Sequence, residues 1–126
     1  MSSAVSPAVP RPSYIELPSR DIDKARSFYA ALFDWKLAGY GPSYACTTFG
    51  QAGGGVDLGL QGDPDEATAA PLPVISVADL DAMLSRVGDL GGTVSRPVFA
   101  FPGGRRFHLI DPNGNEIAIM QPDQEA

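Results

Sequence analysis

His108 is the only histidine among the 126 residues, and its imidazole is the side chain best suited to proton transfer near neutral pH. Glu16 lies in the middle of a short, otherwise apolar segment, and a carboxylate buried in such surroundings is a candidate base. We therefore predict Glu16 and His108 as the catalytic pair if the protein is an enzyme. Each has a structural alternative: His108 can simply be hydrogen-bonded to its surroundings, and Glu16 can form an ion pair with Arg105 or Arg106.

A second group of side chains is suited to holding a ligand. A guanidinium group binds a carboxylate or phosphate through two parallel hydrogen bonds, and Arg105 and Arg106 follow a Pro-Gly-Gly turn that could border a cavity. Because neighbouring strand residues point to opposite faces, only Arg106 is predicted to share a face with His108. An exposed hairpin charge is the alternative. The predicted ligand-binding residues are Tyr14, Asp57, Arg106 and Met120.

The elements that carry these residues form a repeat. An apolar strand pattern at 14–17 precedes Asp21, whose carboxylate can cap a helix, and the same order recurs with a strand at 74–77 and a capping Asp79. An apolar stripe at helical spacing follows each aspartate, and Gly91 and Gly92 end the second stripe. The first stripe contains Ile22, Ala25, Tyr29 and Leu32 or Phe33, and the second contains Leu80, Met83, Leu84, Val87 and Leu90.

Short β segments follow each helix. Strands are predicted at 35–37, 44–49 and 56–60 after the first helix, and at 93–99, 106–110 and 116–120 after the second. Each half is therefore predicted to be β-α-β-β-β. The predicted organisation is a flexible N-terminal arm at 1–12, a domain at 13–122 and a tail at 123–126, and the domain divides into module one (13–61), a linker (62–71) and module two (72–122).

The last hairpin shows which side of a strand faces which environment. A turn is predicted at 111–114, where proline fixes φ while asparagine and glycine tolerate positive φ. Alternation places Phe107, Leu109, Ile117 and Ile119 on the face that packs on a helix. The opposite face carries Arg106, His108, Ile110, Glu116, Ala118 and Met120. By the same rule Ile15 and Leu17 face the core, and Tyr14 and Glu16 face the side of the cavity.

Both ends of the chain resemble one family. The segment Tyr-Ile-Glu-Leu-Pro-Ser-Arg-Asp-Ile-Asp-Lys-Ala-Arg-Ser-Phe-Tyr resembles the opening of the vicinal-oxygen-chelate superfamily, which includes glyoxalase I, extradiol dioxygenases and bleomycin-binding proteins. The segment Phe-Pro-Gly-Gly-Arg-Arg-Phe-His-Leu-Ile-Asp-Pro-Asn-Gly-Asn-Glu-Ile resembles its C-terminal hairpin. The resemblance covers about Ser13 to Gln121. It implies an α+β fold in which two βαβββ modules in tandem form curved mixed sheets that enclose a ligand cavity.

The resemblance also implies where a metal ion would be bound, and this sequence departs from the pattern there. The position seven residues before the capping aspartate of each module is Tyr14 in module one and Leu72 in module two, and the position of the usual C-terminal glutamate is Ala118. Leucine and alanine do not coordinate metals, and a tyrosine must first lose a proton of high pKa. Asp57 is the one candidate near the fourth position. We predict no metal ligands and no cofactor.

Composition limits the possible partners. A net charge of −6 without a basic stripe disfavours nucleic acid, and no apolar run is long enough for a membrane helix. The N-terminal residues lack the pattern of a signal peptide, and the one cysteine, Cys46, has no partner for an internal disulfide. We therefore expect a cytoplasmic protein that neither binds nucleic acid nor enters a membrane.

Together these features predict a glyoxalase/bleomycin-resistance-like protein that binds a small molecule, an antibiotic or a metabolite, without metal, as a homodimer. The alternative is a lyase or isomerase that uses Glu16 and His108 as acid and base. An enzyme with an atypical metal site built from Asp57, Glu16 or His108 is a further possibility, and a purely structural subunit is the last. The sequence does not name the ligand.

Overall fold

The computed structural model describes residues 9–52 and 55–123. They form two compact units, which correspond to the predicted modules one and two: the first is Tyr14–Leu72, and the second combines the chain from Pro73 with residues 9–13. The first strand, β1 (Arg11–Pro18), begins inside the segment predicted as a flexible arm. The rest of that arm up to residue 8, and the tail from residue 124, lie outside the described residues.

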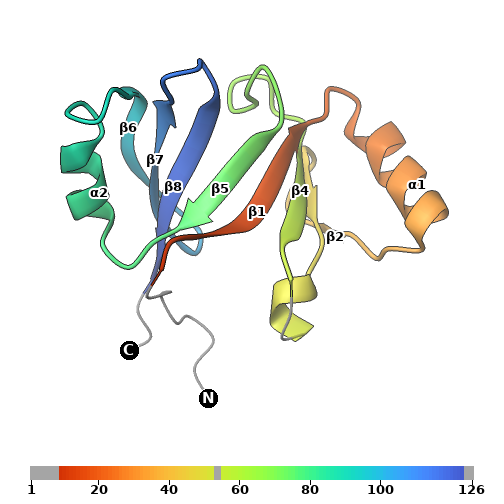
Figure 1. Cartoon of the computed structure of the whole chain (residues 1–126). Helices are drawn as coiled ribbons and strands as arrows, with labels where there is room; N and C mark the ends of the chain where they lie inside the picture. The colour runs from red at the N-terminus through yellow and green to blue at the C-terminus, as the bar shows by residue number, and fades with distance from the viewer. Residues whose placement is uncertain (1–8, 53–54, 124–126) are drawn as a thin grey trace. The chain divides into compact units, whose positions relative to one another are not determined.

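Within the described residues, module one contains one α-helix, one 3₁₀ helix and four strands. After β1 come α1 (Ile22–Phe33), β2 (Ala38–Gly39), β3 (Tyr44–Cys46), a 3₁₀ helix η1 (Phe49–Ala52) and β4 (Asp57–Gln61). The strand order is β2-β3-β4-β1, in which β1 runs parallel to β4 and the other pairs are antiparallel (Figure 1). The first strand of the module therefore lies beside its last.

Module two repeats this topology. It contains β5 (Leu72–Ser76), α2 (Leu80–Arg86), β6 (Thr93–Phe101), β7 (Gly104–Ile110) and β8 (Glu116–Pro122). The order is β5-β8-β7-β6, again with the first strand parallel to the last and the remaining pairs antiparallel. The predicted α+β class and the two β-α-β-β-β modules are confirmed.

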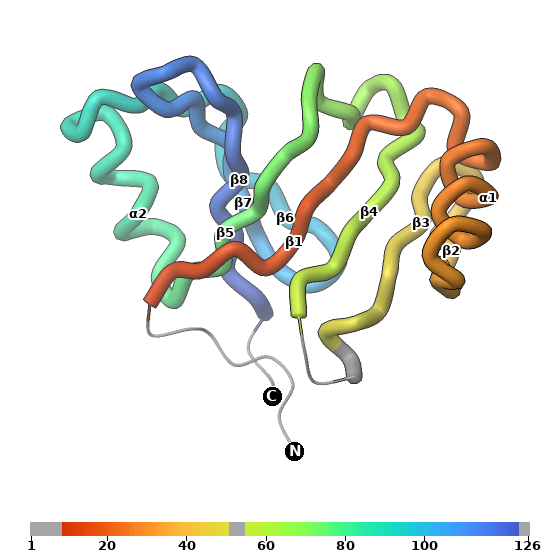
Figure 2. The backbone as a smooth tube through the Cα atoms, turned by 45° about the vertical axis from the view of Figure 1, so that its right-hand side comes forward, coloured from red at the N-terminus to blue at the C-terminus, as the bar shows by residue number. Residues whose placement is uncertain are grey.

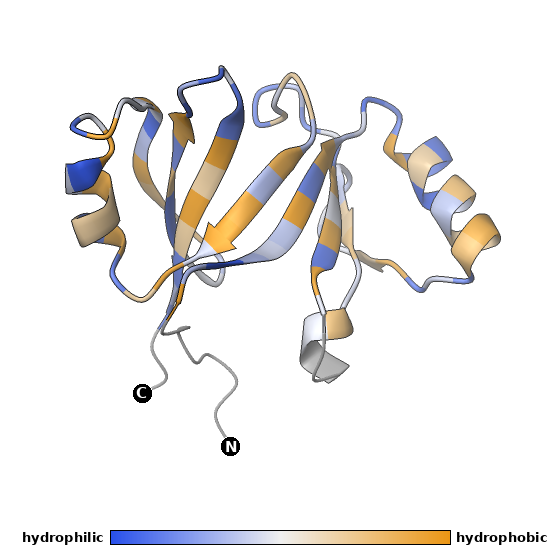
Figure 3. Ribbon diagram, in the orientation of Figure 1, coloured by the Kyte–Doolittle hydropathy of each residue, from blue (hydrophilic) through white to orange (hydrophobic). Residues whose placement is uncertain are grey.

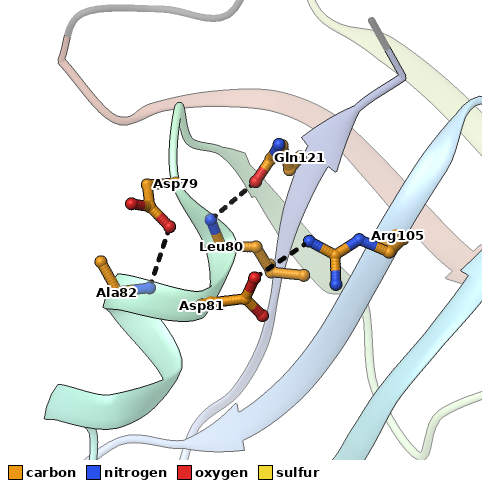
Figure 4. Close-up of polar contacts among 6 residues, drawn as sticks. All are labelled: Asp79, Leu80, Asp81, Ala82, Arg105 and Gln121. Carbon is orange, nitrogen blue, oxygen red and sulfur yellow. Dashed lines mark hydrogen bonds and ion pairs between the residues drawn. The ribbon is translucent and has the colours of Figure 1, made fainter.

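Both predicted helix caps are present. The Asp21 carboxylate accepts a hydrogen bond from Lys24 N at 3.1 Å, and the Asp79 carboxylate accepts one from Ala82 N at 3.0 Å (Figure 4). Helix α2 ends at Arg86, earlier than the apolar stripe suggested, and Leu90 is exposed in the turn that follows. Within the described ranges, no helix has the length and apolarity needed to cross a membrane.

The core of module two lies between α2 and one face of the sheet. Phe107 and Ile119 are buried against Leu80 and Val87 of the helical segment, and Leu109 and Ile117 pack at the edge. These four strand residues are the face predicted to pack on a helix, and hydrophilic and hydrophobic residues alternate along the strands (Figure 3). The opposite face of β7 and β8 therefore does not contribute to this core.

The helix of module one is packed differently from the prediction. Helix α1 contacts β3 and β4 (Figure 2). It contains no buried residue, and Phe28, Leu32 and Phe33 are exposed. Because α1 does not lie over β1, Ile15 is 39% exposed, whereas Glu16 is only 5% exposed. The expectation that Ile15 lies in the core was wrong, because alternation assigns a face and not the element that covers it.

An aromatic cluster replaces the strand predicted at 35–37. Tyr29 of α1 stacks on Phe33 and on Trp35, with ring centroids 6.2 and 6.1 Å apart. Asp34, in the left-handed conformation, ends the helix and turns Trp35 back onto it. Regular pairing therefore starts only at Ala38.

Candidate functional site

The polar face of β7 and β8 collects four of the residues singled out in the sequence. Arg106 lies opposite Met120, and His108 lies opposite Ala118 in the antiparallel register of these strands. On the other side β6 places Arg96 opposite His108 and Phe99 opposite Arg106. The side chains of three neighbouring strands therefore share one surface of module two.

His108 is the centre of this surface. The residue is 1% exposed, and its Nδ1 lies 2.9 Å from Glu116 Oε2, a hydrogen-bonding distance. No protein atom of the described residues is hydrogen-bonded to its other ring nitrogen, Nε2. Glu116 is absent from the set of site residues predicted from the sequence, although alternation placed it on the correct face.

The turn between β7 and β8 sets this pair in place. The Asp111 carboxylate accepts hydrogen bonds from Asn113 N at 2.8 Å and Asn115 N at 2.9 Å, and Gly114 takes a φ of 90°. Hydrogen bonds from Asn115 hold the pKa of Asp111 below its usual value. The turn fixes the register in which Ile110 faces Glu116, so that Glu116 lies diagonally across from His108.

Burial lowers the pKa of His108 below its ordinary value of 6.5. The hydrogen bond and charge of Glu116 act in the opposite direction, and the positive charges of Arg106 and Arg96 add to the lowering. The imidazole is therefore neutral at pH 7. Because the folded-state pKa lies below the unfolded value, the stability from neutral His108 is complete above pH 6.5 and is lost as the pH falls through the folded-state pKa.

Aromatic rings and guanidinium groups surround the histidine. The Phe99 ring centroid lies 5.9 Å from that of His108, and the Arg96 Cζ lies 3.8 Å from the Phe99 centroid. Arg106 is buried, with its Cζ 5.2 Å from the Phe99 ring and 5.4 Å from the Phe101 ring. This is a positively charged, aromatic environment of the kind that suits a flat ligand with an acceptor group.

The neighbour of Arg106 points the other way. Arg105 forms an ion pair with Asp81 of α2 at 3.3 Å, on the helix side of the sheet (Figure 4). Figure 4 also shows the Gln121 side chain accepting a hydrogen bond from Leu80 N, at 2.8 Å. The division of the two arginines between opposite faces is therefore the one predicted from alternation.

Met120 lies beside a serine on the neighbouring strand. Ser76 Oγ is 3.1 Å from Met120 Sδ, and it also shares a hydrogen bond of 2.6 Å with Ser13 Oγ at the start of β1. A thioether is a soft, adaptable contact for a ligand, and the serine fixes its position.

In module one, Tyr14 and Glu16 are joined by Tyr44, which is not among the predicted site residues. The hydroxyl of Tyr44 donates to Glu16 Oε2 at 3.2 Å and is hydrogen-bonded to the hydroxyl of Tyr14. Since Tyr44 donates to the carboxylate, Tyr14 is the donor of the second bond. Burial raises the pKa of both tyrosines, so both are protonated.

Gly59 makes room for this tyrosine pair. It faces Glu16 in the register of β1 and β4 and Cys46 in that of β3 and β4. A Cβ atom at Gly59 would collide with the hydroxyl groups of both Tyr14 and Tyr44. Cys46 lies beside them, and burial raises the pKa of its thiol. The thiol is therefore largely protonated at neutral pH.

Asp57 is hydrogen-bonded to residues near it in the chain. Its carboxylate accepts hydrogen bonds from Thr47 Oγ1 at 2.7 Å, Phe49 N at 2.5 Å and Gly50 N at 3.0 Å. These bonds hold the start of η1, which is why the strand predicted at 44–49 ends at Cys46. The structure thus gives the carboxylate a role in holding the loop, which competes with ligand binding.

The residues at the superfamily's metal positions do not fit a divalent cation. The Tyr14 hydroxyl is protonated and bonded to Tyr44, Leu72 and Ala118 are buried and have no donor atom, and Asp57 holds η1. Among residues 9–52 and 55–123, no three His, Cys, Asp or Glu side chains come together as a metal site would require.

The chain is similar to known proteins of one family over most of its length. The model of the Glyoxalase/Bleomycin resistance protein/Dioxygenase superfamily matches residues 11–119. "Putative glyoxylase CFP32" of Mycobacterium tuberculosis (strain CDC 1551 / Oshkosh) is 28% identical over 90% of this chain and 46% of its own length. "Anthracycline biosynthesis protein DauV" of Streptomyces sp. (strain C5) is 30% identical over 86% of this chain and 40% of its own length. The chain thus spans less than half of these curated relatives.

A solved structure has the same fold. The crystal structure of a glyoxalase/bleomycin resistance protein/dioxygenase superfamily member from Vibrio splendidus 12B01 matches with a TM-score of 0.66 at 18% identity, over 91% of this chain and all of that one. At this identity the likeness concerns the fold alone.

Proposed function

Because the chain belongs to the glyoxalase/bleomycin resistance protein/dioxygenase superfamily, we propose that it is a metal-independent binding protein for a small molecule, an antibiotic or a metabolite. The observation that carries this proposal is the Nε2 atom of His108, which is buried and has no hydrogen-bond partner in the described protein. A buried polar atom left unpaired costs about 1–3 kcal/mol. A bound molecule that pairs with Nε2 recovers that cost.

The neighbours of His108 support an aromatic ligand. The Phe99 ring lies beside the imidazole, with the two ring centroids 5.9 Å apart, and Arg96 and Arg106 bring positive charge to the same surface. A flat ring with a polar or acidic substituent matches both features. Since one relative is named for anthracycline biosynthesis, anthracyclines and other aromatic polyketides are the first ligands to test.

The protein is proposed to act as a homodimer. Phe28, Leu32 and Phe33 form an exposed apolar face on α1, and such a face is normally covered by a partner. The partner is proposed to be a second copy of this chain.

An enzyme is the second candidate, and the hydrogen bond between His108 and Glu116 favours it. A carboxylate that holds one nitrogen of a neutral imidazole leaves the other nitrogen as a base. In a lyase or isomerase of this kind His108 would accept a proton from the substrate, and His108→Leu would then abolish turnover.

Calorimetric titration tests the binding proposal. Protein treated with EDTA is titrated with a panel of anthracyclines and hydroxyanthraquinones, for the wild type, His108→Leu and the matched control Arg105→Gln. Arg105 lies on the helix side of the sheet, so its loss leaves the site intact. We expect micromolar binding by the wild type and the control, and binding about 5–150-fold weaker by His108→Leu, since an unpaired polar group costs about 1–3 kcal/mol.

Two results would contradict the proposal. One is an affinity in the millimolar range or weaker for every compound of the panel. The other is equal affinity of the wild type and a folded His108→Leu variant, and thermal unfolding of each variant establishes that it is folded.

A further inference from the structure

We propose that Glu116 is a positioning residue that holds His108 with its ring proton on Nδ1, so that the ligand docks by donating an O–H or N–H group to Nε2. The geometry that supports this is the 2.9 Å contact between His108 Nδ1 and Glu116 Oε2, together with the buried Nε2, which has no hydrogen-bond partner among the described residues. The part that concerns the ligand rests on the proposed function, and the part that concerns Glu116 does not.

The chemistry of the pair decides the position of the proton. An ionised carboxylate only accepts hydrogen bonds, so Nδ1 must be the donor in this contact. In a neutral imidazole the second nitrogen then carries a lone pair and is an acceptor. The same arrangement orients histidines elsewhere, where a carboxylate on one nitrogen sets the direction and basicity of the other.

Burial keeps the imidazole neutral, although Glu116 raises its pKa. Glu116 of β8 is the acidic group that faces it, and Arg106 of its own strand and Arg96 of β6 are the basic ones. Burial is the largest effect and lowers the pKa of His108, and both arginines lower it further. An imidazolium would carry a proton on Nε2 and would pair with a hydrogen-bond acceptor of the ligand. The neutral form with its proton on Nδ1 pairs instead with a hydrogen-bond donor of the ligand.

These features define a ligand class. The group that meets Nε2 is a hydroxyl or N–H donor, and the Phe99 ring beside the imidazole favours a donor carried on an aromatic ring. The guanidinium groups of Arg96 and Arg106 favour a carbonyl or carboxylate on the same molecule and disfavour a cation. The ligand is therefore an aromatic molecule that carries a hydroxyl or N–H donor and also an acceptor group.

Nitrogen NMR on the free protein tests the role of Glu116. Since His108 is the only histidine, labelling histidine with ¹⁵N gives one pair of ring nitrogens without any assignment step. We expect the proton on Nδ1 in the wild type. In Glu116→Gln we expect this preference to be lost and the pKa of His108 to fall, because Glu116 raises it. The control Asp81→Asn removes a carboxylate on the helix side of the sheet, and it should leave the proton position and the pKa of His108 unchanged.

The direction of the pKa change separates positioning from simple damage. If Glu116→Gln only loosened the structure, solvent would reach the imidazole and its pKa would rise toward the ordinary value. A rise, an unchanged proton position in Glu116→Gln, or a wild-type proton on Nε2 would each overturn the role of Glu116.

Two ligands that differ in one hydroxyl group test whether the ligand donates a hydrogen bond to Nε2. Hydroxyanthraquinone and its methyl ether differ by the O–H that would reach Nε2, and we expect the wild type to prefer the hydroxyl form by about 5–150-fold. Glu116→Gln should narrow this preference. Equal binding of the two compounds would overturn the inferred ligand class, and binding of neither would overturn the proposed function, while the NMR result decides the role of Glu116 independently.

Discussion

Replacing Phe107 with alanine is expected to lower the free energy of unfolding by about 3–5 kcal/mol. Phe107 is 0% exposed and is the largest of the fully buried side chains, and it packs against Leu80, Val87 and Ile119. Truncation removes most of its apolar contacts and leaves a cavity that the helix and sheet of module two fill only in part. Equilibrium unfolding in urea or guanidinium chloride measures the change.

The matched control for this substitution is Leu90→Ala. Leu90 is exposed in the turn after α2, so its loss should change the free energy of unfolding by no more than about 0.5 kcal/mol. Equal losses in the two variants would show that α2 and β7 do not form the core described here. Because Phe107 neighbours His108 but points to the opposite face, such a result would also remove the basis for placing His108.

The second large effect is expected at Gly59. Alanine there brings a Cβ into the hydroxyl groups of Tyr14 and Tyr44, so a ring must move and the hydrogen bonds between Tyr14, Tyr44 and Glu16 are disrupted. Disruption of such a buried network costs about 1–3 kcal/mol. Denaturant unfolding of Gly59→Ala measures the loss, and tyrosine absorbance reports the change around the two rings.

Two further variants make this prediction specific. Gly88→Ala places a Cβ where no atom lies within 4 Å, so it should be neutral or stabilising by up to about 1 kcal/mol. Adding Tyr14→Phe to Gly59→Ala removes one of the colliding hydroxyls and should recover part of the loss. A Gly59→Ala variant as stable as the wild type would contradict the arrangement of the tyrosine pair.

Local periodicity was sufficient to predict most of the fold. Period-two alternation separates Phe107 from His108 and Arg105 from Arg106, because strand geometry alone decides which face each side chain takes. The aspartates at 21 and 79 marked both helix starts, since capping needs only the first turn of the helix. These features depend on neighbours in the chain, so they are visible in the sequence.

Contacts that depend on strand register or on how a helix packs were not predictable in the same way. Glu116 was placed on the correct face, but its bond to His108 depends on the diagonal register of β7 and β8. Burial of Ile15 was predicted wrongly because it depends on where α1 packs. Phe49 N and Gly50 N, which donate to Asp57, belong to a 3₁₀ helix that begins inside the segment predicted as a strand at 44–49.

The most direct test of a metal-independent ligand site is native mass spectrometry of protein purified without chelators. It reports bound metal, bound small molecule and the number of chains in one measurement. We predict a dimer that carries an organic molecule and no metal, and loss of that molecule in His108→Leu. Stoichiometric zinc, nickel, manganese or iron in the wild type would contradict the account.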